Sequence, residues 1–121
     1  MPSLYLERDG IRLANVIPAR TFFQRLRGLM FTKELPAGKV LMITPCRSVH
    51  TFFMRYPIDI LFLDRNLRVV EACPVLKPNR LSPIVKEAHH VLELPAGTID
   101  RLKIRPGDQL KITDGQGGAD Q

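Results

Sequence analysis

The sequence contains no tryptophan and only two cysteines, and it has no apolar run long enough to cross a bilayer. A transmembrane helix needs roughly 20 consecutive apolar residues, so we expect no membrane partner. The first residues, MPSLYLERDG, lack a basic segment followed by an apolar one, and therefore do not resemble a secretory signal. Together these absences predict a cytoplasmic protein.

The two cysteines, Cys46 and Cys73, are 27 positions apart and fit no common zinc or redox motif. In a reducing compartment they remain thiols, whereas in an oxidising one they could form a bridge. Three residues separate Cys46 from His50, which is not a specific zinc pattern without a second paired motif. We therefore expect no metal and no cofactor.

Common catalytic motifs are also missing. The chain has no phosphate-binding loop, no glycine-rich dinucleotide turn, no nucleophile elbow and no metalloprotease helix motif. These absences argue against phosphate-cradle enzymes and the common hydrolases. If the protein is an enzyme, its catalytic residues are unknown, because no motif identifies them.

Positive charge is abundant but diffuse. Eighteen Lys and Arg against twelve Asp and Glu give a net charge of +6, which attracts nucleic acid and acidic partners at long range. The basic residues never form a run of three, and aromatic residues make up only 7% of the chain. Since nucleic-acid recognition uses clustered cations and stacking aromatics, we expect no specific nucleic-acid partner.

The 121 residues are 45% hydrophobic, which suits one domain with one core. Alternating apolar residues on either side of Asp9-Gly10, a dipeptide typical of tight turns, predict a hairpin with strands at about 3–8 and 11–16. Further strands are predicted from the same kind of pattern at 40–44, 48–54, 58–64, 67–75, 89–94 and 109–113.

Helical spacing of apolar residues appears once with clarity, at about 19–30, and a second short helix is predicted at about 98–103. The predicted fold class is α+β, mainly β: a rolled antiparallel sheet or small barrel packed by the main helix. We expect a single domain over 1–113 and a flexible tail over 114–121, which has no apolar anchor.

The most unusual segment is VHTFFMRYPIDILFLD, residues 49–64, because His50, Arg55 and Asp59 interrupt an otherwise apolar stretch. Asp59 lies among apolar strand positions, so its carboxylate must be paired or hydrogen-bonded. Arg55 is the nearest predicted partner, with Arg47 next. A structural role is therefore favoured for Asp59.

Several cationic or switchable side chains lie close together in the same region, and they would suit a small anion or an acidic partner. The candidate ligand-binding residues are Arg47, His50, Thr51 and Arg55. Three carboxylates elsewhere are predicted to be structural, in turns or in the core: Asp59, Glu93 and Asp108.

Five segments together resemble a known family: RLRGLMF (25–31), CRSVHTFFMRYPIDILFLD (46–64), VVEACPVLKP (69–78), HVLELPAG (90–97) and PGDQLKI (106–112). They are similar to the uncharacterised prokaryotic family called domain of unknown function 192, in the leaderless branch that carries His-Thr-Phe-Phe-Met. The resemblance implies one small β-rich domain and no established activity.

Three hypotheses for function remain open at this point. The first is a non-catalytic binding or accessory protein for a small anionic ligand or an acidic partner. The second is an undescribed enzyme that uses His50 with Asp59 or Glu93 as an acid–base pair. The third is weak, non-specific binding of nucleic acid through the overall charge. An open cleft shared by His50 and a carboxylate would favour the enzyme.

Overall fold

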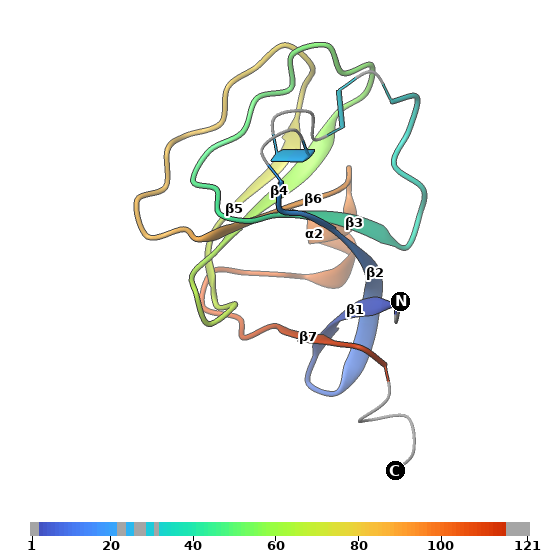
Figure 1. Cartoon of the computed structure of the whole chain (residues 1–121), viewed down its shortest axis with the longest axis vertical. Helices are drawn as coiled ribbons and strands as arrows, with labels where there is room; N and C mark the ends of the chain where they lie inside the picture. Colours follow the sequence, from blue (N-terminus) through green and yellow to red (C-terminus); the bar gives the residue numbers. More distant parts are fainter. Residues whose placement is uncertain (1–2, 22–23, 26–28, 31, 116–121) are drawn as a thin grey trace.

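The main feature of the computed structural model is one curled sheet of seven strands (Figure 1). The structure describes residues 3–21, 24–25, 29–30 and 32–115. The strands are β1 (Leu4–Arg8), β2 (Ile11–Ala19), β3 (Lys39–Ile43), β4 (Ile58–Leu63), β5 (Val69–Leu76), β6 (His90–Pro95) and β7 (Lys111–Thr113). The predicted mainly β fold is confirmed.

The strand order across the sheet is β5-β4-β6-β3-β2-β1-β7. Every neighbouring pair is antiparallel except β2 and β3, which run parallel. The sequence predicted an antiparallel sheet, and this one pair departs from it because a long connection, rather than a hairpin, joins the two strands.

The sheet curls until the start of β5, at one edge, meets the segment before β7, at the other edge. The amide of Val69, which begins β5, donates to the carbonyl oxygen of Asp108 over 2.9 Å, and the amide of Gly107 donates back to the carbonyl of Val69 over 2.7 Å. A bridge between Arg68 and Gln109 joins the same two segments. The twist between neighbouring strands brings the edges round in this way, so the sheet is rolled as predicted.

The first two strands form the predicted hairpin. Asp9 and Gly10 have positive φ angles of 54° and 77°, as the central residues of a tight two-residue hairpin turn require. The second strand is longer than predicted, because its last residues, up to Ala19, pair with β3.

Buried apolar side chains form two clusters, one on each face of the sheet. The side chains of Leu61 and Leu92 belong to the inner cluster, which the curled sheet surrounds. Those of Ile60 and Val91 belong to the outer cluster, which loops cover. All six residues of β4 are buried, so this strand is central and covered on both sides. The single predicted core is therefore divided by the sheet itself.

The short helix predicted at about 98–103 is confirmed as α2 (Thr98–Leu102). It begins after Gly97, whose φ of 93° is in the left-handed region that glycine tolerates without strain. Among the described residues, no helix is long and apolar enough to cross a membrane.

The main helix predicted at about 19–30 is described only in part. Ala19 belongs to β2, so the helix begins later. The Thr21 hydroxyl accepts the amide of Gln24 over 3.1 Å, and the Gln24 side chain accepts the amide of Thr21 over 3.1 Å. This reciprocal pair is a capping box, which marks a helix start. The rest of the prediction, at 22–23 and 26–28, lies outside the described residues.

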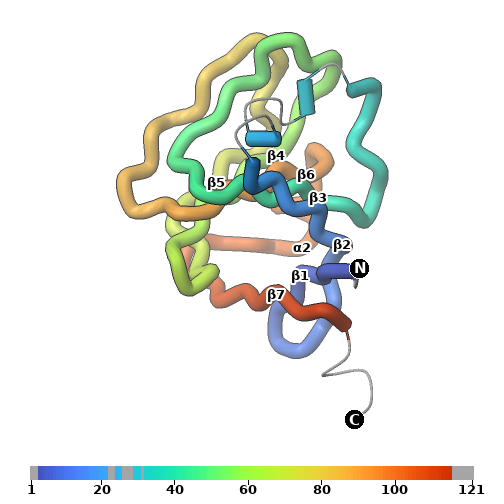
Figure 2. The backbone as a smooth tube through the Cα atoms, viewed as in Figure 1, coloured from blue at the N-terminus to red at the C-terminus, as the bar shows by residue number. Residues whose placement is uncertain are grey.

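The strand predicted at 48–54 is wrong. This segment is part of a long loop, 45–57, that runs beside a second loop, 77–89 (Figures 1 and 2). In the described part of the chain, its one ladder contact is an antiparallel bridge between His50 and Leu81. We call the two segments the loop pair. It covers the outer cluster, to which it contributes Met54 and Val85.

Candidate functional site

The four candidate ligand-binding residues all lie in the first loop of the loop pair, but their environments differ. Arg47 and Arg55 are exposed, His50 is half-buried, and Thr51 is completely buried. The Thr51 hydroxyl donates to the carbonyl of Lys77 and accepts the amide of Arg80 over 2.9 Å. In this structure Thr51 therefore joins the two loops and has no surface open to a ligand.

The His50 ring stacks on Phe52, with 5.1 Å between ring centroids and an angle of 23° between the planes. Its Nδ1 accepts the backbone amide of Phe52 over 3.2 Å. This contact leaves Nε2 as the ring nitrogen available to a partner, because a neutral imidazole that accepts through Nδ1 carries its proton on Nε2.

Arg47 lines a surface depression of about 340 Å³. Four of its lining residues carry cationic or imidazole side chains: Arg47, Arg65, Lys86 and His89. Two carry carboxylates: Asp64 and Glu87. We call this site the basic depression. Its residues come from the first loop, from the turn between β4 and β5, and from the end of the second loop.

Backbone hydrogen bonds hold these three segments together. The amide of Cys46 donates to the carbonyl of His89 over 3.0 Å, and the amide of His89 donates to the carbonyl of Leu63 over 2.8 Å. The amide of Val85 donates to the carbonyl of Arg47 over 2.9 Å. Each segment is thus fixed to the next one, so the backbone under the cationic side chains is preorganised.

The carboxylate of Asp64 is already engaged at one oxygen. Its Oδ1 accepts the amide of Asn66 over 2.8 Å and the amide of Arg68 over 3.0 Å. These bonds stabilise the turn between β4 and β5. Arg65 lies in this turn, between Asp64 and Asn66, so the same bonds fix the position of its backbone. Asp64 is therefore chiefly a turn residue, and the exposed carboxylate of the site is Glu87.

Asp59 is fully buried, and both carboxylate oxygens accept backbone amides. Oδ1 accepts the amide of Val75 and Oδ2 accepts the amide of Ile99, each over 2.8 Å. Asp59 thereby ties β4 to the end of β5 and to the start of α2. Its partners are backbone groups rather than Arg55, the side chain that the sequence favoured, because Arg55 lies on the exposed side of its loop.

Glu93 is only 2% exposed, and its Oε1 finds no hydrogen-bond partner among the residues that the structure describes. Burial raises the pKa of this carboxyl group to about 8, because an ion is costly to remove from water. Glu93 is therefore a neutral acid at pH 7. It pairs in the sheet with Leu41 and Ile60, on the face of the outer cluster.

The proposed acid–base pairs are not assembled. Asp59 and Glu93 alternate onto opposite faces of the sheet, because Asp59 pairs with Leu94 whereas Glu93 pairs with Ile60. Both carboxyl groups are almost completely sealed. Within the described residues, neither carboxyl group is open to a cleft that His50 could share.

Burial disfavours the reactive thiolate form of both cysteines, and His90 is hydrogen-bonded to Thr44, just beyond the neighbouring strand β3. Burial raises the pKa of the Cys46 thiol and that of the Cys73 thiol, and both cysteines are free. Burial, followed by the neighbouring His89, lowers the pKa of His90, whose Nδ1 lies 2.7 Å from the Thr44 hydroxyl. In the described part of the chain, no three His, Cys, Asp or Glu gather in a way that could hold a metal.

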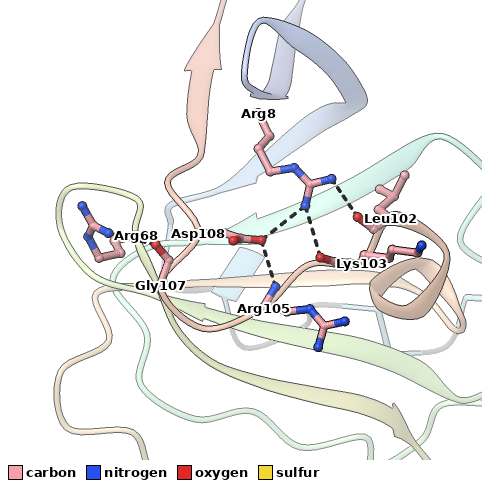
Figure 3. Close-up of polar contacts among 7 residues, drawn as sticks. All are labelled: Arg8, Arg68, Leu102, Lys103, Arg105, Gly107 and Asp108. Atoms are coloured by element: carbon pink, nitrogen blue, oxygen red, sulfur yellow. Dashed lines mark hydrogen bonds and ion pairs between the residues drawn. The ribbon is translucent and has the colours of Figure 1, made fainter.

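Asp108 lies in the turn before β7, where its carboxylate joins Arg8 and Arg105 (Figure 3). Its Oδ2 accepts the Arg105 amide over 2.9 Å and lies 3.3 Å from an Arg8 nitrogen. The same Arg8 guanidinium donates to the carbonyl of Leu102 over 2.7 Å and so caps the last turn of α2. These contacts attach the hairpin of β1 and β2 to α2 and to the turn before β7.

Comparison with known proteins gives the chain its family. Residues 5–112 match the family model DUF192, described as Uncharacterized ACR. The chain belongs to the DUF192 family. UPF0127 proteins of Pyrococcus furiosus and Pyrococcus horikoshii are each 38% identical to it over 98 residues, with 77% of this chain and 82% or 83% of the relative covered.

A crystal structure from Novosphingobium aromaticivorans, described as a protein of unknown function, is similar to this DUF192 protein. The TM-score is 0.78 at 25% sequence identity, over 90% of this chain and 83% of the other. The predicted resemblance to this family is thus confirmed. The descriptions of these three relatives name no activity, so the function has to be argued from the site.

Sequence reasoning named Arg47 but missed its neighbours in the basic depression. Arg65, Lys86 and His89 lie 18 to 42 positions from Arg47 in the chain, and no local pattern links them. The available signal was the density of polar residues in the predicted turn after β4 and in the proline-rich segment before β6.

Proposed function

We propose that this protein is a non-catalytic binding domain whose ligand is a small anion held in the basic depression. The observation that carries the proposal is the convergence of Arg47, Arg65 and Lys86, from three separate segments, around one depression of about 340 Å³. Guanidinium groups can donate two parallel hydrogen bonds to a carboxylate or phosphate, and an ammonium adds a compact third charge.

The size and composition of the depression narrow the ligand class. Its volume is near the lower end of the range for small-molecule sites, which suits an anion such as phosphate, pyrophosphate or a small polycarboxylate. His89 adds a ring N–H that can donate to the ligand. Glu87 disfavours a second negative group on its side of the depression, so the anion would lie toward Arg47 and Arg65.

The test is calorimetric titration with pyrophosphate at low salt. The double variant Arg65→Ala/Lys86→Ala removes two cations of the depression, and Lys39→Ala/Arg101→Ala removes two exposed cations on β3 and α2. Both variants change the net charge equally. We expect the first to weaken binding at least about tenfold, since a charged hydrogen bond contributes roughly 1.5–3 kcal/mol, and the second to bind like the parent protein.

Two results would reject the proposal. One is the absence of any heat of binding with pyrophosphate, phosphate or citrate. The other is an equal loss of affinity in both double variants, because that pattern would mean attraction by total charge without a defined site.

A further inference from the structure

Large apolar side chains are exposed along the loop pair. Relative exposure is 39% for Phe52, 61% for Phe53, 71% for Leu81 and 79% for Ile84. Single exposed apolar residues are common, but four on two adjacent loops form a patch, and such patches mark interaction surfaces.

The backbone holds this patch outward. Thr51 donates its amide to the carbonyl of Arg80 over 2.9 Å, and Ser82 donates its amide to the carbonyl of Val49 over 2.9 Å. Between these bonds His50 and Leu81 form the bridge. Thr51 and Ser82 are buried, so the alternating neighbours point away from the core. The ladder therefore fixes Phe52 and Leu81 outward, and Phe53 and Ile84 are exposed next to them along each loop.

The same two loops carry a strong positive charge. Five cations lie on them, all exposed: Arg47, Arg55, Lys77, Arg80 and Lys86. The one acidic residue in 45–57 and 77–89 is Glu87, which leaves a net charge of +4, or five minus one. The surface thus combines exposed apolar tips with surrounding cations.

We propose that the loop pair docks the protein onto the surface of an anionic lipid bilayer. Apolar tips enter the boundary between headgroups and acyl chains, while Lys and Arg beside them contact anionic headgroups. This contact needs no membrane-spanning segment, so the lack of a long apolar run does not oppose it. The partners expected from the sequence did not include a membrane, and the exposed loop pair is the reason to add one.

Charge and shape favour a bilayer over two other occupants. A second copy meeting the same face would bring two surfaces of like charge together, which is costly. An acidic protein would satisfy the charges, but protein interfaces also need closely matching shapes. Four apolar side chains that project from loops fit a fluid surface, which adapts to them.

Co-sedimentation with vesicles tests the proposal. Vesicles of phosphatidylcholine are compared with vesicles of phosphatidylcholine and phosphatidylglycerol in equal parts. We expect binding to the anionic vesicles, and at least about a tenfold loss for Leu81→Ser/Ile84→Ser and for Lys77→Gln/Arg80→Gln. Neither variant touches a side chain of the basic depression, so the result is independent of the proposed anion site.

Matched controls remove similar groups elsewhere. Ile11 is 66% exposed at the start of β2, in the hairpin at the opposite end of the molecule from the loop pair (Figure 1). Ile11→Ser and Lys39→Gln/Arg101→Gln should bind anionic vesicles like the parent protein. Failure of the parent to bind, or equal binding by Leu81→Ser/Ile84→Ser, would overturn the proposal.

A fluorescence reporter adds a test that does not depend on loss of binding. Because the chain has no tryptophan, Phe52→Trp introduces a single one at the loop pair, and Ile11→Trp introduces one at the distant hairpin. We expect a blue shift on adding anionic vesicles for Phe52→Trp alone. A shift at Ile11→Trp instead, or a shift at Phe52→Trp produced equally by soluble polyglutamate, would assign the surface to another partner and refute bilayer docking.

Discussion

The buried Glu93 predicts that the protein becomes less stable as the pH rises through the neutral range. Its carboxyl group has a pKa of about 8 in the folded protein against an ordinary value of 4.5. Between these values the folded state keeps a proton that the unfolded state releases. The contribution of Glu93 to stability is therefore fully present below about pH 4.5 and is lost as the pH rises through about 8.

The size of the effect follows from the interval between the two pKa values. Each pH unit within it lowers the free energy of unfolding by about 1.4 kcal/mol. From pH 4.5 to pH 7 the loss attributable to Glu93 is therefore about 3 kcal/mol, a large part of the stability of a small domain. Glu93→Gln has a similar shape without an ionisable proton, so it should remove this dependence on pH.

Urea denaturation at a series of pH values between 4.5 and 8 measures the effect. The informative quantity is the difference in unfolding free energy between Glu93→Gln and the parent protein, which should grow in favour of the variant as the pH rises. Taking the difference cancels the opposite contribution of His90, whose lowered pKa makes stability rise with pH. Glu71→Gln, on the exposed side of β5, is the matched control.

A difference between Glu93→Gln and the parent that stays constant over this pH range would refute the reasoning. It would mean that Glu93 ionises in the folded state at an ordinary pKa, and hence that water or a cation reaches it. The same conclusion would follow if Glu71→Gln altered the pH dependence as much as Glu93→Gln.

Three further predictions concern stability and charge. Asp59→Asn should cost about 1–3 kcal/mol in denaturant melts, because asparagine keeps one accepting oxygen and puts an NH₂ donor against the second backbone amide. His50→Ala, on the half-exposed loop, should cost less, and the reverse order would contradict the assigned roles. Arg8→Ala should lower the unfolding free energy by about 1 kcal/mol through loss of the α2 cap, and an unchanged melt would show that solvent replaces it. Binding to nucleic acid, measured by fluorescence anisotropy, should be weak, insensitive to sequence and steeply dependent on salt, because the positive charge is diffuse. A clear preference for particular bases would contradict this explanation of the binding.

Local sequence patterns predicted the fold well where turn chemistry and packing agree. Asp9-Gly10 specified the first hairpin, and the apolar residues on both faces of β4, interrupted only by Asp59, indicated a strand covered on both sides. The capping box of Thr21 and Gln24 was also visible in the sequence, and it would have started the main helix later than hydrophobic spacing did.

The apolar residues at 48–54 predicted an alternating strand, but burial in this segment does not alternate. Thr51 and Met54 are buried, whereas Phe52 and Phe53 between them are both exposed. The segment pairs with the second loop only through single contacts. An apolar, aromatic-rich stretch therefore does not by itself distinguish a strand from a loop lying on a core.

The candidate site depended on information that no local pattern contains. Arg47 was identifiable from its cationic neighbourhood, but its approach to Arg65 and Lys86 follows from the way His89 bonds to Leu63 and Cys46. The partners of Asp59 are likewise backbone amides, at Val75 and Ile99, that only the folded chain brings near.

The most direct test of the proposed function is amide chemical-shift mapping by NMR during a titration with pyrophosphate. The account predicts saturable shifts concentrated at Arg47, Arg65, Lys86 and His89, the residues that line the basic depression, with Lys39 and Arg101 unaffected. Shifts that are absent, or that spread over the basic surface without saturation, would contradict it.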